Sequence, residues 1–264
     1  MEDSMDNKTQ KPTADQVAQV ARLAARLVLE NGGETYRAED VALHIAAAFD
    51  LEADIIAFPT GLTMTVTGES SSSSMIARVR GTTVDLMKLE QINSVSRKIS
   101  CHEMSLEEGR KELLRIRDQA PLSAGKIVVY AGVSAAMFAV MFGGALFDSI
   151  ATGVCGAVIQ LVLNHTPDHQ AGMPVSSLIS GFLAGLLALL FVGIFNQSNL
   201  DLIIVSTMMP FLPGLALTNA IRDSMRGDLL SGGARLGQAL TRAIVLASGV
   251  GAALGLRIAL GGVI

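Results

Sequence analysis

Charged side chains are almost absent from the part of this 264-residue chain that follows Lys126. A soluble helix carries a polar face along its length, whereas a helix that crosses a membrane needs roughly 20 apolar residues to span about 30 Å of hydrocarbon. The uncharged stretches have the second composition, so the sequence predicts transmembrane helices. These stretches cover residues 127–147, 149–167, 169–200, 202–221 and 243–256.

Other absences narrow the class of protein. Only two cysteines occur, and because Cys101 lies in the polar half and Cys155 in an apolar stretch, no disulfide is expected between them. The formal net charge of −4 argues against a nucleic-acid-binding protein, which normally has a basic surface. His165 and His169 lack a third ligand, so no metal site is predicted. Neither the nucleotide-binding G-x-x-x-x-G-K-[ST] motif nor the G-x-S-x-G motif of hydrolases occurs, and no cofactor is expected.

Residues 14–121 have the pattern of a cytosolic α+β domain, preceded by a tail over residues 1–13. No apolar signal segment opens the chain, so this domain is expected to stay in the cytoplasm. The serine run over 70–74 is expected to form an exposed loop. Helices are predicted over 14–31, 36–50, 86–99 and 105–119, and strands over 54–58, 62–67 and 75–80.

Two groups of charged residues in this domain have alternative interpretations. Asp40 and His44 are four residues apart on one helix face and could orient an imidazole for base chemistry, which makes a membrane-anchored hydrolase one hypothesis. A solvated helix face is the other interpretation. Arg78 and Arg80 are either ligands for an acidic molecule or solvated charges on a strand. The candidate residues of the predicted helix and the turn before it are Glu34, Arg37, Glu39, Asp40 and His44.

Residues 122–264 are predicted to form a transmembrane domain, so the expected fold is a membrane protein with a bundle of about five helices after the α+β domain. Lys and Arg gather before the first span and after the fourth, and such residues mark the cytoplasmic side. Arg117 and Arg226 are therefore expected inside and Asn196 outside, in a bacterial plasma membrane. The predicted spans are 127–147, 149–163, 176–195, 202–218 and 240–261.

The fourth predicted span contains the sequence Pro210-Phe-Leu-Pro213-Gly214. Each proline removes a backbone donor and crowds the preceding turn, so the helix is expected to break. Transporters use broken helices to hold ions and small charged substrates. The break is either part of a substrate path or a structural kink.

Small residues recur every four positions in the third and fifth predicted spans. This spacing lets helices approach closely and indicates a compact bundle or an oligomer interface. The residues are Gly181, Gly185, Ala247, Gly251 and Gly255.

Few ionisable groups lie at the predicted membrane edges. The candidate proton carriers are Asp148 and Asp201 here and Asp223 after the fourth predicted span, and Arg257 lies within the last apolar segment. A charge within a membrane is costly and tends to be functional or paired, so Asp201 is a candidate partner of Arg257. Snorkelling of Arg257 to the outer surface is the alternative.

Five short stretches resemble the threonine/serine exporter family (ThrE-like). They are PGLALTNAIRD over 213–223, GDLLSGGAR over 227–235, GETYRAED over 33–40, PTGL over 59–62 and NSVSR over 93–97. The resemblance implies a cytosolic module followed by about five spans. Because the chain ends after its fifth predicted span, it is similar to the split-subunit branch, in which a second small membrane protein supplies the other half. Members of that branch include a pair associated with succinate export.

The residues that follow the predicted break form a polar stripe at helical spacing. Arginine forks and asparagine donors suit a carboxylate substrate, although ordinary juxtamembrane anchors would give the same pattern. The leading hypothesis is a subunit of a secondary exporter of small carboxylate-bearing metabolites, first of all threonine or serine, coupled to protons or another ion and assembled as an oligomer with its partner subunit. A dicarboxylate exporter, the hydrolase, and a scaffold or sensor are the alternatives. The pathway candidates are Pro210, Pro213, Gly214, Asn219, Arg222, Asp223, Asp228 and Arg235.

Overall fold

The computed structural model describes residues 12–69, 71–166, 168–195 and 199–261. Contacts divide the chain into two compact units. The first, here called the N-terminal unit, comprises Met1–Ala120 together with Ala216–Leu236. The second, here called the helical unit, comprises Pro121–Leu215 and Gly237–Ile264. A stretch far along the sequence therefore packs with the N-terminal residues.

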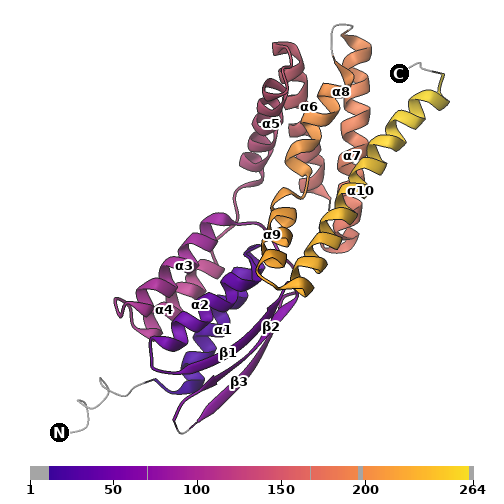
Figure 1. Ribbon diagram of the computed structural model, residues 1–264. Coiled ribbons are helices and arrows are strands. Elements are labelled where there is room, and N and C mark those ends of the chain that lie inside the picture. Colours follow the sequence, from indigo (N-terminus) through magenta and orange to yellow (C-terminus); the bar gives the residue numbers. More distant parts are fainter. Residues whose placement is uncertain (1–11, 70, 167, 196–198, 262–264) are drawn as a thin grey trace. The chain divides into compact units, whose positions relative to one another are not determined.

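The N-terminal unit is an α+β structure with one three-stranded antiparallel sheet in the order β1-β2-β3. Helices α1 and α2 pack on one face of the sheet, and α3 and α4 pack against these helices (Figure 1). The elements before Ala120 are α1 (Ala14–Glu30), α2 (Thr35–Ala47), β1 (Glu52–Phe58), β2 (Gly61–Thr67), β3 (Ser72–Arg78), α3 (Leu86–Ser100) and α4 (Leu106–Arg117).

Local signals determine where these helices begin and end. Thr13 and Gln16 form a reciprocal capping box at the start of α1, and Ser105 and Glu108 form another at the start of α4. Gly32 follows α1 with a φ of +80°, a conformation that costs little only for glycine. The predicted helices and the predicted meander of strands are confirmed.

The alternation in β2 separates the buried side chains of Leu62, Met64 and Val66 from threonines that are exposed or half-buried. The prediction of a loop over the whole serine run was wrong, because β3 begins at Ser72. Ser72 to Ser74 pair with the end of β2, and the hydroxyls of Ser74 and Thr65 lie 2.8 Å apart. Pairing with β2 satisfies the backbone of these polar residues, which composition alone did not indicate.

Among the described residues of the chain, four helices are long and apolar enough to cross a membrane, or five if an interrupted pair is one span. The fifth predicted span begins earlier than expected, because α10 is continuous from Leu229. The helices are α5 (Ala124–Met141), α6 (Leu146–His165), α7 (Asp168–Ile194), α8 (Leu200–Met208), α9 (Gly214–Met225) and α10 (Leu229–Ala259), with the 3-10 helix η1 (Met209–Phe211) after α8.

The predicted break in the fourth span is confirmed. Regular structure ends at Phe211 and resumes at Gly214, and Leu212 has an extended conformation. Pro210 and Pro213 have no backbone N–H, so the helical ladder cannot continue through them.

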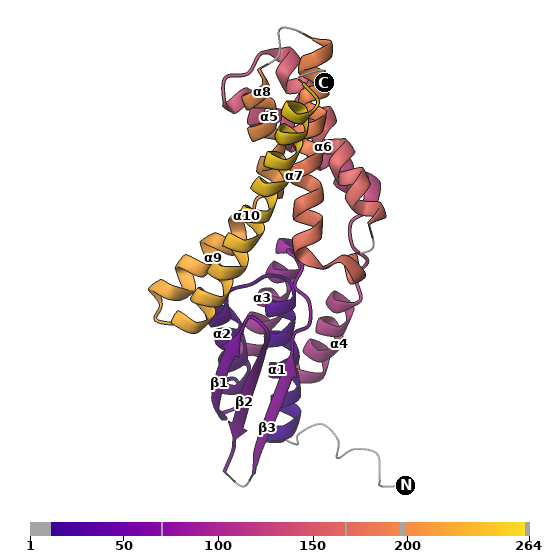
Figure 2. The ribbon, with the colours of Figure 1, turned by 90° about the vertical axis from the view of Figure 1, so that its right-hand side faces the viewer.

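Within the helical unit, small residues bring α7 and α10 close together (Figure 2). A Cβ atom at Gly181 would collide with the backbone carbonyl of Leu246, and one at Gly185 would lie 2.8 Å from the Cβ of Ala253. The predicted role of Gly181 and Gly185 in close packing is thus confirmed.

The stripe predicted on α10 does not serve this contact. Gly251 and Gly255 have open space where a Cβ would be, and Ala247 is exposed. Gly249 is the α10 glycine that packs against α7, because it lies on the same helix face as the buried residues Leu246, Val250 and Ala253.

Candidate functional site

A group of charged and polar side chains gathers in the N-terminal unit, where the turn before α2 meets α9 and the start of α10. Most of them are pathway residues that the sequence predicted. Asn219, Arg222 and Asp223 share one face of α9 because of their spacing of three and four residues. We call this group the polar cluster: Glu34, Thr35, Asn219, Arg222, Asp223, Asp228 and Arg235.

The centre of the polar cluster is a buried ion pair between α9 and α10. Arg235 Nε lies 3.1 Å from Asp223 Oδ2, and the two side chains are 10% and 0% exposed. Arg235 Nη2 also donates to the carbonyl of Gly33 at 2.7 Å. Neither carboxylate oxygen of Asp223 has a hydrogen bond in the described part of the chain, so opposite charge alone holds this pair together. A buried charge is costly unless it is paired, so each of these residues depends on the other.

Glu34 holds a second ion pair with Arg222, and the guanidinium of Arg37 lies 3.3 Å from the same carboxylate. Burial alone would raise the pKa of Glu34, but a backbone hydrogen bond and the charges of Arg37 and Arg222 lower it below its ordinary value. Glu34 therefore stays ionised as a fixed negative charge beside two arginines.

Hydrogen bonds complete the connection between the turn and the two helices. Asn219 Nδ2 donates to the carbonyl of Gly32 at 3.0 Å, and Thr35 Oγ1 donates to Asp228 Oδ2 at 2.8 Å. Asp228 Oδ1 also accepts from the backbone N–H of Ser231 at 3.2 Å, in the first turn of α10. The turn carbonyls after α1 thus obtain partners from residues almost 200 positions later.

Glu39 lies one turn further along α2, and its partly buried carboxylate is close to other acidic side chains. Burial raises the pKa of Glu39, and the charges of Asp228, Asp40 and Asp223 raise it further. A hydrogen bond from the backbone N–H of Ala57, at 2.8 Å, lowers this pKa but does not cancel the rise. Glu39 therefore resists ionisation more than an ordinary glutamate does.

The predicted pair of Asp40 and His44 does not form an acid–base couple. His44 Nδ1 lies 2.6 Å from the backbone carbonyl of Asp40 and not from its carboxylate, and both side chains are exposed. His165 Nδ1 likewise contacts the carbonyl of Leu161. Within the described part of the chain no group of His, Cys, Asp or Glu could hold a metal ion, while His169 lies outside the described side chains.

In the helical unit, Asp148 has a structural position. Its carboxylate accepts from the backbone N–H of Ala145 and from that of Asn199, each at 3.1 Å, so it caps α6 and ties it to the start of α8. Asp201 is exposed and Arg257 is half-buried. Among the residues that the structure describes, no ion pair joins Asp201 to Arg257.

The sequence interpretation missed two hydroxyl residues that precede the break at Pro210. Ser206 and Thr207 on α8 are fully buried. Neither hydroxyl has a hydrogen-bond partner among the described residues. Two adjacent hydroxyl residues, four and three positions before a proline in an apolar span, were the available signal.

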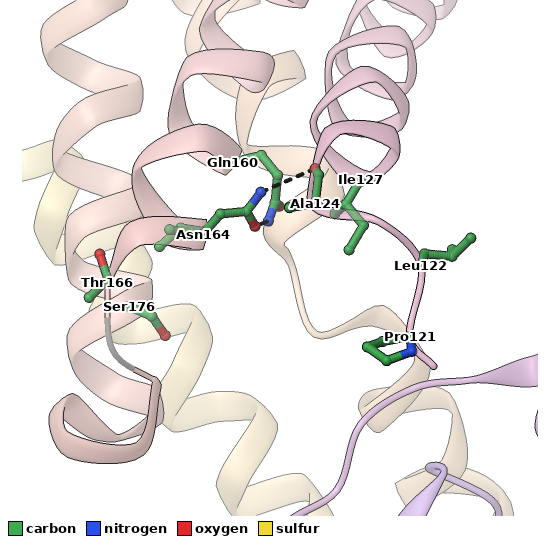
Figure 3. Close-up of a pocket in the computed structure, with 9 residues that line it drawn as sticks. Pro121, Leu122, Ala124, Ile127, Gln160, Asn164, Thr166 and Ser176 are labelled. Carbon is green, nitrogen blue, oxygen red and sulfur yellow. Dashed lines mark hydrogen bonds between the residues drawn. The ribbon is translucent and has the colours of Figure 1, made fainter. Parts of the chain in front are cut away.

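A cavity of about 480 Å³ in the helical unit is lined by residues of α5, α6 and α7 and by the segments directly before α5 and after α6 (Figure 3). Gln160 Nε2 donates to Asn164 Oδ1 at 2.9 Å, and Asn164 Nδ2 donates to the carbonyl of Ala124 at 3.2 Å. Two amides four residues apart in the uncharged stretch 149–167 would have indicated this polar wall.

Comparison with known proteins places the chain in one family. The family model ThrE, described as "Putative threonine/serine exporter", matches residues 19–257. The match includes residues of both units. No curated protein and no solved structure matches the chain.

Proposed function

Because the chain belongs to the threonine/serine exporter family, we propose that it is a subunit of a secondary exporter that moves threonine or serine out of the cell. The observation that carries this proposal is the interruption between Phe211 and Gly214. Interrupted helices supply charged half-helix ends and free carbonyls to small substrates and coupling ions. An amino acid offers a carboxylate and an ammonium group, which need partners of opposite polarity.

The interruption suits both ends of such a substrate. The N-terminus of α9, which begins at Gly214, has a positive partial charge that favours a carboxylate. Pro210 cannot donate to the carbonyl of Ser206, and the buried Ser206 hydroxyl has no partner in the described chain. These two oxygens would accept from an ammonium group or bind a coupling cation.

We assign the polar cluster a supporting role in the transport cycle. In the present conformation the carboxylate of Glu34 is held by Arg222, and Arg235 is held by Asp223. These arginines are therefore not free to bind a substrate carboxylate until the pairs exchange. We propose that Arg222 and Arg235 change partners during transport. This change would link the turn before α2 to the state of α9 and α10.

We further propose that a second membrane subunit completes the transporter, with several copies of each in a bacterial plasma membrane and the N-terminal residues in the cytoplasm. The support is the free face of α10. Gly251 and Gly255 have no neighbouring atoms within 4 Å of a Cβ position, and Gly233 and Gly237 have none either. Glycines four apart are suited to contact with another helix.

A transport assay tests the proposal directly. Cells that express the chain together with its genomic neighbour would be loaded with labelled threonine, and its efflux would be measured. Ser206→Ala should lower efflux at least tenfold, whereas Ser248→Ala should leave it unchanged. Ser248 is the matched control because its exposed hydroxyl bonds to its own helix at Ile244.

The outcomes separate the parts of the proposal. Efflux of succinate in place of threonine would replace the amino-acid substrate by a dicarboxylate. Equal efflux by the chain without its neighbour would exclude an obligatory second subunit. Full threonine efflux by Ser206→Ala would remove the interruption from the substrate or ion path.

A further inference from the structure

A groove lined by arginines lies beside α1 and β3 in the N-terminal unit and shares no residue with the polar cluster. Its volume is about 360 Å³. Arg22 and Arg26 come from one face of α1, Arg78 ends β3 and Arg80 follows it, so two distant segments supply four guanidinium groups. Glu30 is the one acidic residue in the lining, which therefore has a formal charge of +3.

The single acidic residue does not neutralise the groove. Arg26 Nε binds Glu30 Oε1 at 2.7 Å. The other three arginines therefore have no carboxylate partner among the lining residues. Arg22 Nη1 reaches the carbonyl of Ile76 only at 3.5 Å, and its buried Nε has no hydrogen-bond partner among the residues described. A desolvated guanidinium donor without an acceptor costs free energy, and an oxyanion in the groove would remove this cost.

The backbone at this edge adds further donors. Val79 N–H donates to the carbonyl of Thr60, the residue directly before β2. Backbone groups alternate along an antiparallel ladder, so those of Ile76 and Arg78 point to the outer edge of β3. The contact from Arg22 to the Ile76 carbonyl agrees with this direction. An added Cβ at Gly81 would meet no atom within 4 Å, so the space beside this edge is open.

We infer that this groove binds a phosphate group, either of a free metabolite or of an anionic lipid headgroup. Guanidinium forks bind phosphate through pairs of parallel hydrogen bonds, and a phosphate has enough charge and acceptor oxygens for several arginines. A zwitterionic amino acid has no net charge and would leave the formal charge of +3 uncompensated. The inference is independent of the transported substrate.

Calorimetric titration tests the site with the full chain in a maltoside detergent, which contains no phosphate. Inorganic pyrophosphate is the soluble probe. Arg22→Gln and Arg78→Gln should each weaken its binding about tenfold or more, because each removes charge-assisted hydrogen bonds. Arg110→Gln is the matched control, since Arg110 is an exposed arginine of the same unit, 3.7 Å from Glu107.

Native mass spectrometry of the chain taken from nanodiscs with and without phosphatidylglycerol identifies the source of the phosphate. A retained anionic lipid that Arg22→Gln loses assigns the site to a headgroup. Binding of pyrophosphate without a retained lipid assigns it to a free metabolite. Unchanged helix content by circular dichroism would show that the variants are folded.

Three results would overturn the inference. The first is the absence of both pyrophosphate binding and a retained lipid in the wild-type chain. The second is an equal loss of binding in Arg110→Gln, which would indicate general charge attraction. The third is binding of succinate as tight as that of pyrophosphate, which would show that the groove does not select phosphate.

Discussion

The buried pair of Asp223 and Arg235 allows a quantitative test of how the N-terminal unit is held together. Asp223→Leu would leave Arg235 charged and buried, and Arg235→Met would leave Asp223 in the same position. Each side chain is at most 10% exposed, so solvent screens the remaining charge little. Removing one partner of a buried pair costs about 3–5 kcal/mol, whereas replacing both by apolar residues is often near neutral.

The double variant is expected to recover most of this loss. It lacks both charges but also lacks the 2.7 Å hydrogen bond from Arg235 to the Gly33 carbonyl. A hydrogen bond to a charged group contributes about 1.5–3 kcal/mol, which is the loss expected for the double variant. The two single losses should therefore add up to well more than the loss in the double variant.

Hydrogen–deuterium exchange measures the local stability around this ion pair. Peptides that cover residues 30–36 and 216–236 should exchange roughly 10² to 10⁴ times faster in each single variant, since about 1.4 kcal/mol corresponds to a factor of ten. Arg110→Met, an exposed arginine of the same unit, is the control and should change exchange little. If the free energy lost in the double variant equals the sum of the losses in the two single variants, the two residues do not form a coupled pair.

Three further predictions concern other parts of the molecule. Glu39→Gln should raise stability at pH 7 and flatten the dependence of stability on pH. The pKa of Glu39 is raised in the folded state, so the free energy of unfolding falls as pH rises above the ordinary value of 4.5, and glutamine removes this loss. An unchanged pH profile of thermal unfolding would contradict this. Gly181→Ala should cost about 1–3 kcal/mol through the clash with the carbonyl it faces, while Gly193→Ala, with open space, should change stability by less than about 0.5 kcal/mol, and equal melting temperatures would refute the packing argument. Cysteine labelling from outside intact cells should modify position 196, which lies outside the described residues, and should not modify position 226; the reverse pattern would overturn the topology inferred from basic residues.

Much of the fold could be predicted from the sequence because its determinants lie close together along the chain. The capping box of Thr13 and Gln16 needs only residues three apart, and the alternation in β2 needs only neighbours. The interruption before Gly214 was predictable because proline lacks a backbone donor wherever it occurs. The serine run failed as a predictor because pairing with β2, not composition, decides whether those residues form a strand.

The sequence by itself determined the apolar helices, the break in the fourth predicted span and the residues of the polar stripe. Only the tertiary structure decided the partners of those residues. Arg222 pairs with Glu34, which lies 188 positions earlier, and Arg235 bonds to the Gly33 carbonyl, 202 positions earlier. It also decided that Gly249, and not Gly251, packs against α7. Periodicity and capping act between near neighbours, whereas the partner of a charge or of a helix face depends on where the folded chain returns.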